Sequence, residues 1–266
     1  MSFEFTKENI DSYLKELARE YRRQVGKGMP AELILIGGAS VLVNYGFRNM
    51  TTDIDAVIRG ASAMKDAILR VGDRFGLPAG WLNEDFTHTD SYTPRLDEFS
   101  TYYRTYANVL TVRTVSAEYL IAMKLRSGRQ YKSDLSDVLG ILAEHQRQGA
   151  PLSLAHIQRA AADLYGDRDA LPEPSRRFIA NVMEKGDFEA LYDEVVRGEQ
   201  ETRGLLLDFE KNYPQAMGSE NVDTIAETLQ QKTDRATVMA MLRKRQAEGA
   251  AQEQDAHAVH GDDLER

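Results

Sequence analysis

Two aspartates and a pair of glycines are the residues in this chain best suited to chemistry. Gly37 and Gly38 follow the short apolar run of residues 33–36 and precede apolar residues at helical spacing. Asp53 and Asp55 stand two residues apart in a later apolar segment, so a strand there points both carboxylates to one face. Carboxylate oxygens that converge in this way are suited to holding Mg²⁺.

The glycines predict the other half of such a site. A Gly-Gly turn lets the backbone come close to a ligand, because no Cβ blocks the approach. The helix that follows directs free N–H groups and the positive end of its dipole to the same place, which favours an anion. Triphosphate and magnesium bind together, so the glycines and the aspartates support each other. The alternative is an ordinary strand–turn–helix–strand unit with a tight turn and solvated aspartates.

A second group of charged residues follows Ser116, which is expected to cap a helix. Lys124 interrupts the apolar pattern of that helix, and a buried lysine needs a partner. A phosphate or the carboxylate of Asp134 in the next helix could be that partner, and Asp137 follows one helical turn later. Three more basic residues lie nearby: Arg126, Arg129 and Lys132. They form either a solvated turn or a surface that binds nucleotide or RNA.

The first group resembles the signature of the polymerase-β-type nucleotidyltransferase superfamily, in which a glycine turn and a short helix precede Asp-x-Asp on the next strand. The fuller pattern is similar to the AbiEii-like branch, bacterial nucleotidyltransferases of which many are toxins of toxin–antitoxin pairs. Its residues here are Gly37, Gly38, Ala39, Ser40, Arg48, Thr52, Asp53 and Asp55. The second group resembles the branch's Leu-x-Ala-x-Lys helix, followed by basic residues and Asp-x-x-Asp. Ser133 stands where that branch often has a basic residue.

The resemblance implies transfer of a nucleoside monophosphate from an NTP to a tRNA or protein acceptor, with Mg²⁺ as cofactor and a cognate antitoxin as a candidate partner. It implies that Asp53 and Asp55 hold the metal, and that Asp134 or Asp137 orients or deprotonates the acceptor. With Lys124, which would touch the triphosphate, these residues form the implied catalytic set. The remaining implied nucleotide-binding residues are Gly37, Gly38, Ser40, Arg48 and Thr52.

One feature departs from the superfamily pattern. Relatives usually carry a third carboxylate on a later strand, and residues 109–113 contain none. Asp97 and Glu98, which precede the strands, are the remaining candidates. The missing third carboxylate supports a second hypothesis, that the chain is an inactive nucleotidyltransferase fold that acts as a binding or antitoxin-like partner. The intact pair of Asp53 and Asp55 argues against it.

Composition limits the class of protein further. The chain has 266 residues, 42% of them hydrophobic, no cysteine and a formal net charge of −9. Without cysteine there is no disulfide, thiol catalysis or Cys-ligated zinc. The N-terminal segment lacks the pattern of a signal peptide and no apolar run is long enough to span a bilayer, so we expect a soluble, cytoplasmic protein. An RNA partner would have to bind a local basic patch on an acidic body.

These patterns predict an α+β fold: a small mixed β-sheet nucleotidyltransferase core with flanking helices, followed by a helical C-terminal region. An amphipathic helix is expected over residues 6–26, and the expected strands cover residues 33–36, 53–58, 101–106 and 109–115. The predicted divisions are a nucleotidyltransferase-like domain at 1–148, a helical region at 149–247 and an acidic, disordered tail at 248–266. Trp81 is interpreted as a core residue, with stacking on a base as the alternative.

Overall fold

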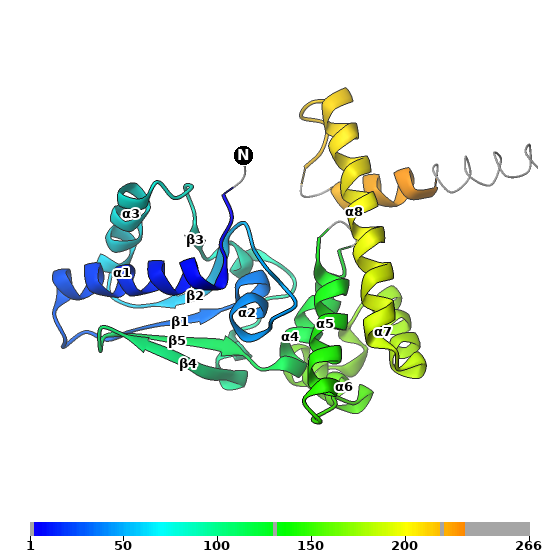
Figure 1. Cartoon of the computed structure of the whole chain (residues 1–266), viewed down its shortest axis with the longest axis horizontal. Coiled ribbons are helices and arrows are strands. Elements are labelled where there is room, and N and C mark those ends of the chain that lie inside the picture. The colour runs from blue at the N-terminus through cyan, green and yellow to red at the C-terminus, as the bar shows by residue number, and fades with distance from the viewer. Residues whose placement is uncertain (1–2, 130–131, 219–220, 232–266) are drawn as a thin grey trace, which may run out of the picture. The chain divides into compact units, whose positions relative to one another are not determined.

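The structure is a computed structural model that describes residues 3–129, 132–218 and 221–231. It confirms the α+β class: a mixed sheet with flanking helices, followed by a helical C-terminal region (Figure 1). Residues 3–129 and 133–196 form one compact unit, and Lys132 and the described residues from 197 onward belong to a second. The acidic tail expected at 248–266 lies outside the described residues.

The sheet has five strands in the order β3-β2-β1-β5-β4. Their bounds are β1 (Ala31–Leu35), β2 (Ile54–Arg59), β3 (Leu82–Asn83), β4 (Ser100–Tyr106) and β5 (Leu110–Val115). Strand β1 is central; it runs antiparallel to β2 and parallel to β5. The four longer strands match the predicted ones to within about two residues. The sequence pattern did not predict β3, because two residues are too few to show a periodicity.

One face of the sheet is covered by α1 (Lys7–Val25) and α3 (Ala63–Phe75), which lie on the same side of it in Figure 1. The apolar positions of α1 face the strands, and its N-terminus is closed by a capping box at Thr6. Trp81 packs in this layer, where it is 2% exposed and donates its ring N–H to the carbonyl of Ile68. The interpretation of Trp81 as a core residue is therefore confirmed.

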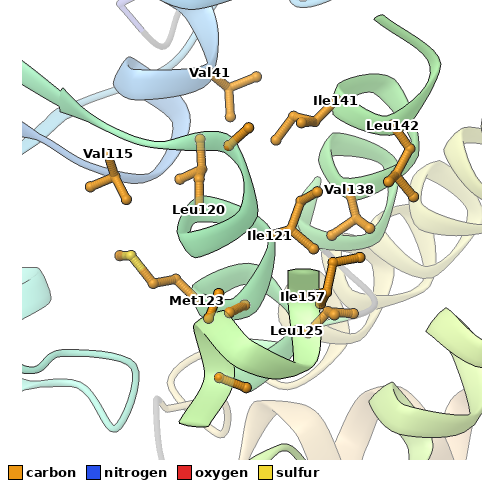
Figure 2. Close-up of a cluster of buried hydrophobic side chains, with 14 of the residues drawn as sticks. Val41, Val115, Leu120, Ile121, Met123, Leu125, Val138, Ile141, Leu142 and Ile157 are labelled. Carbon is orange, nitrogen blue, oxygen red and sulfur yellow. The ribbon is translucent and has the colours of Figure 1, made fainter. Parts of the chain in front are cut away.

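The helices between residues 117 and 185 gather around a second core cluster, and the first two of them hold the second charged group. They are α4 (Ala117–Ser127), α5 (Asp134–Arg147), α6 (Leu154–Tyr165), η3 (Arg168–Ala170) and α7 (Glu173–Lys185). Their buried side chains form one cluster with Ile34 of β1 and with Val41 of α2 (Gly37–Asn44). Figure 2 shows Val41, Leu120 and Ile141 of this cluster gathered between α2, α4 and α5. The shared core fixes the glycine turn relative to α4 and α5.

Two 3₁₀ segments, η1 (Asp85–His88) and η2 (Pro94–Phe99), connect β3 to β4. The helix α8 (Phe188–Asn212) begins in the first unit and continues into the second, and residues 222–231 are also helical. Within the second unit, Gln230 donates a hydrogen bond of 2.6 Å to the hydroxyl of Thr202. Among the residues that the structure describes, no helix is both long and apolar enough to cross a membrane.

Candidate active site

The glycine pair lies within the first turn of α2, two residues after β1 ends. The helix was expected from residue 39, so the glycines form its N-terminus and not a turn that precedes it. Gly37 has φ +55°, and a Cβ placed on it would lie 3.3 Å from Oδ2 of Asp55. The site therefore needs glycine at this position for both backbone conformation and space. The orphan N–H groups of a helix N-terminus lie at the same point.

Strand pairing brings the aspartates to this turn. Leu35 pairs with Ala56 in the β1–β2 register, and the backbone N–H of Ile36 donates to the carbonyl of Asp55. Asp55 is half-buried on β2, whereas Asp53 is exposed and immediately precedes the strand. The expected alternation of side chains along this segment is confirmed, since Ile54 and Ala56, the neighbours of Asp55, are buried in the core beneath α1 and α3.

Arg48 lies against the second glycine. A Cβ on Gly38 would be 2.9 Å from Nη2 of Arg48 and 2.6 Å from Oγ1 of Thr51. The guanidinium is held by two other contacts: Nε donates to the carbonyl of Met50 at 3.0 Å, and Nη1 donates to Oδ2 of Asp137 at 2.5 Å. A glycine, a cation and a hydroxyl therefore meet beside the N-terminus of α2.

We expect Gly38→Ala to disturb this arrangement. The new methyl group would overlap the Thr51 hydroxyl and displace Arg48, at a cost of about 1–3 kcal/mol, which is typical of overpacking. Urea denaturation measures this cost. The matched control is Gly46→Ala, because nothing lies within 4 Å of a Cβ at Gly46. Equal stabilities of the two variants would contradict the close approach at Gly38.

Lys124 is buried and lies between two carboxylates. Its Nζ is 2.9 Å from Oδ1 of Asp134 and 2.8 Å from Oδ2 of Asp137, and the second oxygen also accepts from Arg48. Arg129 Nε donates to the other oxygen of Asp134 at 2.8 Å. Arg129, Asp134, Lys124, Asp137 and Arg48 thus form a chain of alternating charges from the α4–α5 connection to Gly38, which we call the ion-pair chain.

The surroundings of the ion-pair chain shift the ionisation of its members. Burial by itself lowers the pKa of the Lys124 amine, but the carboxylates of Asp134 and Asp137 outweigh burial and raise it above its ordinary value. Burial likewise raises the pKa of the Asp134 carboxyl, but Lys124 and Arg129 outweigh it and hold that pKa well below its usual range. Both groups are charged at neutral pH.

These shifts predict how stability depends on pH. The Asp134 pKa is lower in the folded state than its unfolded value of about 3.9, so its contribution is complete above that value and is lost as pH falls through the folded pKa. The free energy of unfolding should therefore decrease in acid, and the decrease should be shallower in Asp134→Asn. Urea denaturation between about pH 2 and pH 7 compares the two slopes. Identical slopes would mean that Asp134 is not ion-paired.

Several predicted site residues do not join this cluster directly. Ser40 is fully buried, and its hydroxyl has no hydrogen-bond partner in the described part of the chain. Thr52 is exposed beside Asp53. Arg126 donates to the carbonyl of Ala170 and lies over the ring of Tyr165, so it serves the packing of the helices. Among the expected basic residues, Arg129 belongs to the ion-pair chain.

The candidates for a third carboxylate are paired elsewhere. Asp97 contacts Arg59, and Glu98 lies 3.2 Å from Arg95. Across residues 3–129, 132–218 and 221–231, no group of three or more His, Asp or Glu side chains is placed to hold a metal ion.

Sequence reasoning missed two contributors to the site, Thr51 and Gly140. Thr51 is buried, and its backbone pairs with Phe5 in an isolated β-bridge. Gly140 on α5 receives the ring of Phe47, which a Cβ would overlap. No sequence signal marks either residue, because each depends on a neighbour distant in the chain.

Comparison with known protein families finds one match. A family model described as "Nucleotidyltransferase of unknown function (DUF6036)" matches residues 12–144. The match spans the sheet, the glycine turn, both aspartates and the ion-pair chain. No match was found among curated proteins or among solved structures.

Proposed function

The chain belongs to this family of nucleotidyltransferases, and from that premise we propose that it moves a nucleoside monophosphate from an NTP to a tRNA or protein acceptor, with pyrophosphate leaving. We further propose, from the motifs shared with the AbiEii-like branch, that it acts as the toxin of a toxin–antitoxin pair. The observation that carries the transferase proposal is the convergence of Gly37, Gly38, Asp55 and Arg48 at the N-terminus of α2.

The residues present fit a magnesium ion that arrives with its nucleotide. Mg²⁺ usually keeps several waters and is held by one or two carboxylates together with substrate phosphates. Asp55 supplies a carboxylate on β2 beside Gly37, and the exposed Asp53 immediately before the strand would supply the second. Asp53 and Asp55 would hold the ion, which would supply positive charge against the negative charge that develops as pyrophosphate leaves.

The protein's own groups would bind and orient the triphosphate. The N–H groups of the first turn of α2 favour an anion, and Gly37 and Gly38 leave room for it to approach. Arg48 adds a fixed positive charge at the same turn. The buried hydroxyl of Ser40 has no hydrogen-bond partner among the described residues, and it is the kind of group that a bound ligand or water satisfies.

Labelled nucleotides test the proposal. The purified protein is incubated with each α-³²P-labelled NTP, magnesium and total cell lysate, and we expect label in RNA or in protein that EDTA abolishes. Treatment with nuclease or protease then identifies the acceptor class. The negative control is Asp55→Asn protein in the same lysate: any label transferred there comes from the lysate's own enzymes.

Titration calorimetry separates the alternatives. We expect the NTP to bind with magnesium and to bind far more weakly with EDTA. Equal affinity in both conditions would remove the metal role of Asp53 and Asp55. Metal-dependent binding without transfer to any acceptor would favour the inactive, antitoxin-like binding protein.

A further inference from the structure

The hydrogen bonds of Arg48 leave one of its nitrogen atoms for a ligand. A guanidinium carries five N–H donors in a planar fork. Nε is used by the carbonyl of Met50 and Nη1 by Asp137. Nη2 lies beside Gly38 and makes no hydrogen bond within the part of the chain that the structure describes. The two used nitrogens therefore fix the plane of the guanidinium, and the third faces the turn where a phosphate is expected.

Asp137 is poorly placed to accept a proton from an acceptor. Its side chain is 3% exposed, and its Oδ2 is shared by Arg48 at 2.5 Å and by Lys124 at 2.8 Å. A general base must come within hydrogen-bond reach of the proton that it removes. Two cations occupy that oxygen, and the surrounding core leaves almost none of the carboxylate open to a substrate.

A second contact ties Arg48 to the same helix. Gly140 lies three residues after Asp137, so the two positions share one face of α5. The ring of Phe47 occupies the space that a Cβ of Gly140 would take. Phe47 also packs against Tyr45 and Tyr192, with ring centroids 5.7 and 5.9 Å away. The adjacent residues Phe47 and Arg48 therefore dock on α5 side by side.

We propose that Asp137 is a positioning residue: it holds Arg48 over Gly38, and Nη2 of Arg48 binds a phosphate oxygen of the nucleotide. The inference rests on the proposed transferase function. It assigns the main charged contact with the triphosphate to Arg48, because Lys124 is already enclosed between two carboxylates. Arginine suits this task because its fork can bind one anion while other N–H groups bind a second.

The two readings of Asp137 predict different kinetics. If Asp137 positions Arg48, Asp137→Asn weakens nucleotide binding and raises KM by about 10–100-fold, the scale of losing a supporting contact. The pH dependence of kcat is then unchanged. If Asp137 is a base, kcat falls by about 10²–10⁴-fold and the pH profile loses one limb.

A double-mutant cycle tests the link to Arg48. Affinity for α,β-methylene analogues of the four NTPs, with magnesium, is measured by calorimetry for wild type, Asp137→Asn, Arg48→Met and the double variant. Since Asp137 acts through Arg48, the double variant should bind no more weakly than Arg48→Met. The control on the same helix is Glu144→Gln, whose side chain pairs with Arg147 and Gln148 among the residues that the structure describes.

Gly140→Ala keeps every charged group, so it is the variant to test if Asp137→Asn does not fold. Its methyl group pushes Phe47 from α5, and with it Arg48, so analogue affinity should fall in the same direction. Wild-type affinity in a folded Asp137→Asn or Gly140→Ala, or additive effects in the cycle, would overturn the positioning role. A wild-type protein that binds none of the four analogues would instead remove the proposed function, and this inference with it.

Discussion

Lys124→Met is expected to lower the free energy of unfolding by about 3 kcal/mol, the lower end of the range for breaking a buried ion pair. The loss is large because the side chains of Asp134 and Asp137 are 1% and 3% exposed, and each would lose a cation at hydrogen-bond distance. It stays at the lower end because Arg129 still pairs with Asp134, and Arg48 with Asp137. Urea denaturation followed by circular dichroism measures the change.

The matched control is Lys65→Met on α3, whose lysine is exposed. It should change stability by less than about 0.5 kcal/mol, as surface substitutions usually do. Nucleotide affinity measured on the same Lys124→Met preparation decides whether Lys124 also touches the triphosphate. A Lys124→Met protein as stable as the wild type would contradict the ion pairs, and unchanged affinity as well would leave Lys124 without either role.

Asp55→Asn is expected to reduce kcat/KM for nucleotide transfer by about 10²–10³-fold, the scale of removing one group that stabilises charge in a transition state. Asparagine keeps the size of the side chain but removes the negative charge beside Gly37 that would hold Mg²⁺. The labelling assay with the best NTP measures this loss. Asp53→Asn should lower activity in the same way without affecting folding, because Asp53 is exposed.

Asp66→Asn on α3 controls for the loss of one negative charge, and it should retain full activity because Asp66 is exposed on a helix that packs on the other face of the sheet. Thermal unfolding of each variant separates activity from stability. A fall of several degrees in the Tm of Asp53→Asn would show that this carboxylate supports the fold, in favour of an ordinary structural unit without a metal site.

The sequence by itself determined the strands, helices and chemical groups that make up the site. Residues 33–36 form an apolar run, and such a run before two glycines predicts a buried strand that ends at the glycines, although the structure makes these glycines the first turn of α2. The alternation around Asp53 and Asp55 predicts which side chains face away from the core, and the structure has this pattern. These features depend on local periodicity and on the steric freedom of glycine, so neighbouring residues suffice to predict them.

Only the tertiary structure decided which charged groups meet. The sequence left Lys124 with two alternatives, a phosphate or Asp134, and the structure pairs it with both Asp134 and Asp137. Arg48 reaches Asp137 across 89 residues of chain. Such contacts depend on how α2, α4 and α5 pack around their common core, and no local pattern contains that information. From the sequence, such charged side chains could equally be solvated or bind a ligand. Once folding buries them, each needs an opposite charge nearby, because a buried unpaired charge is costly.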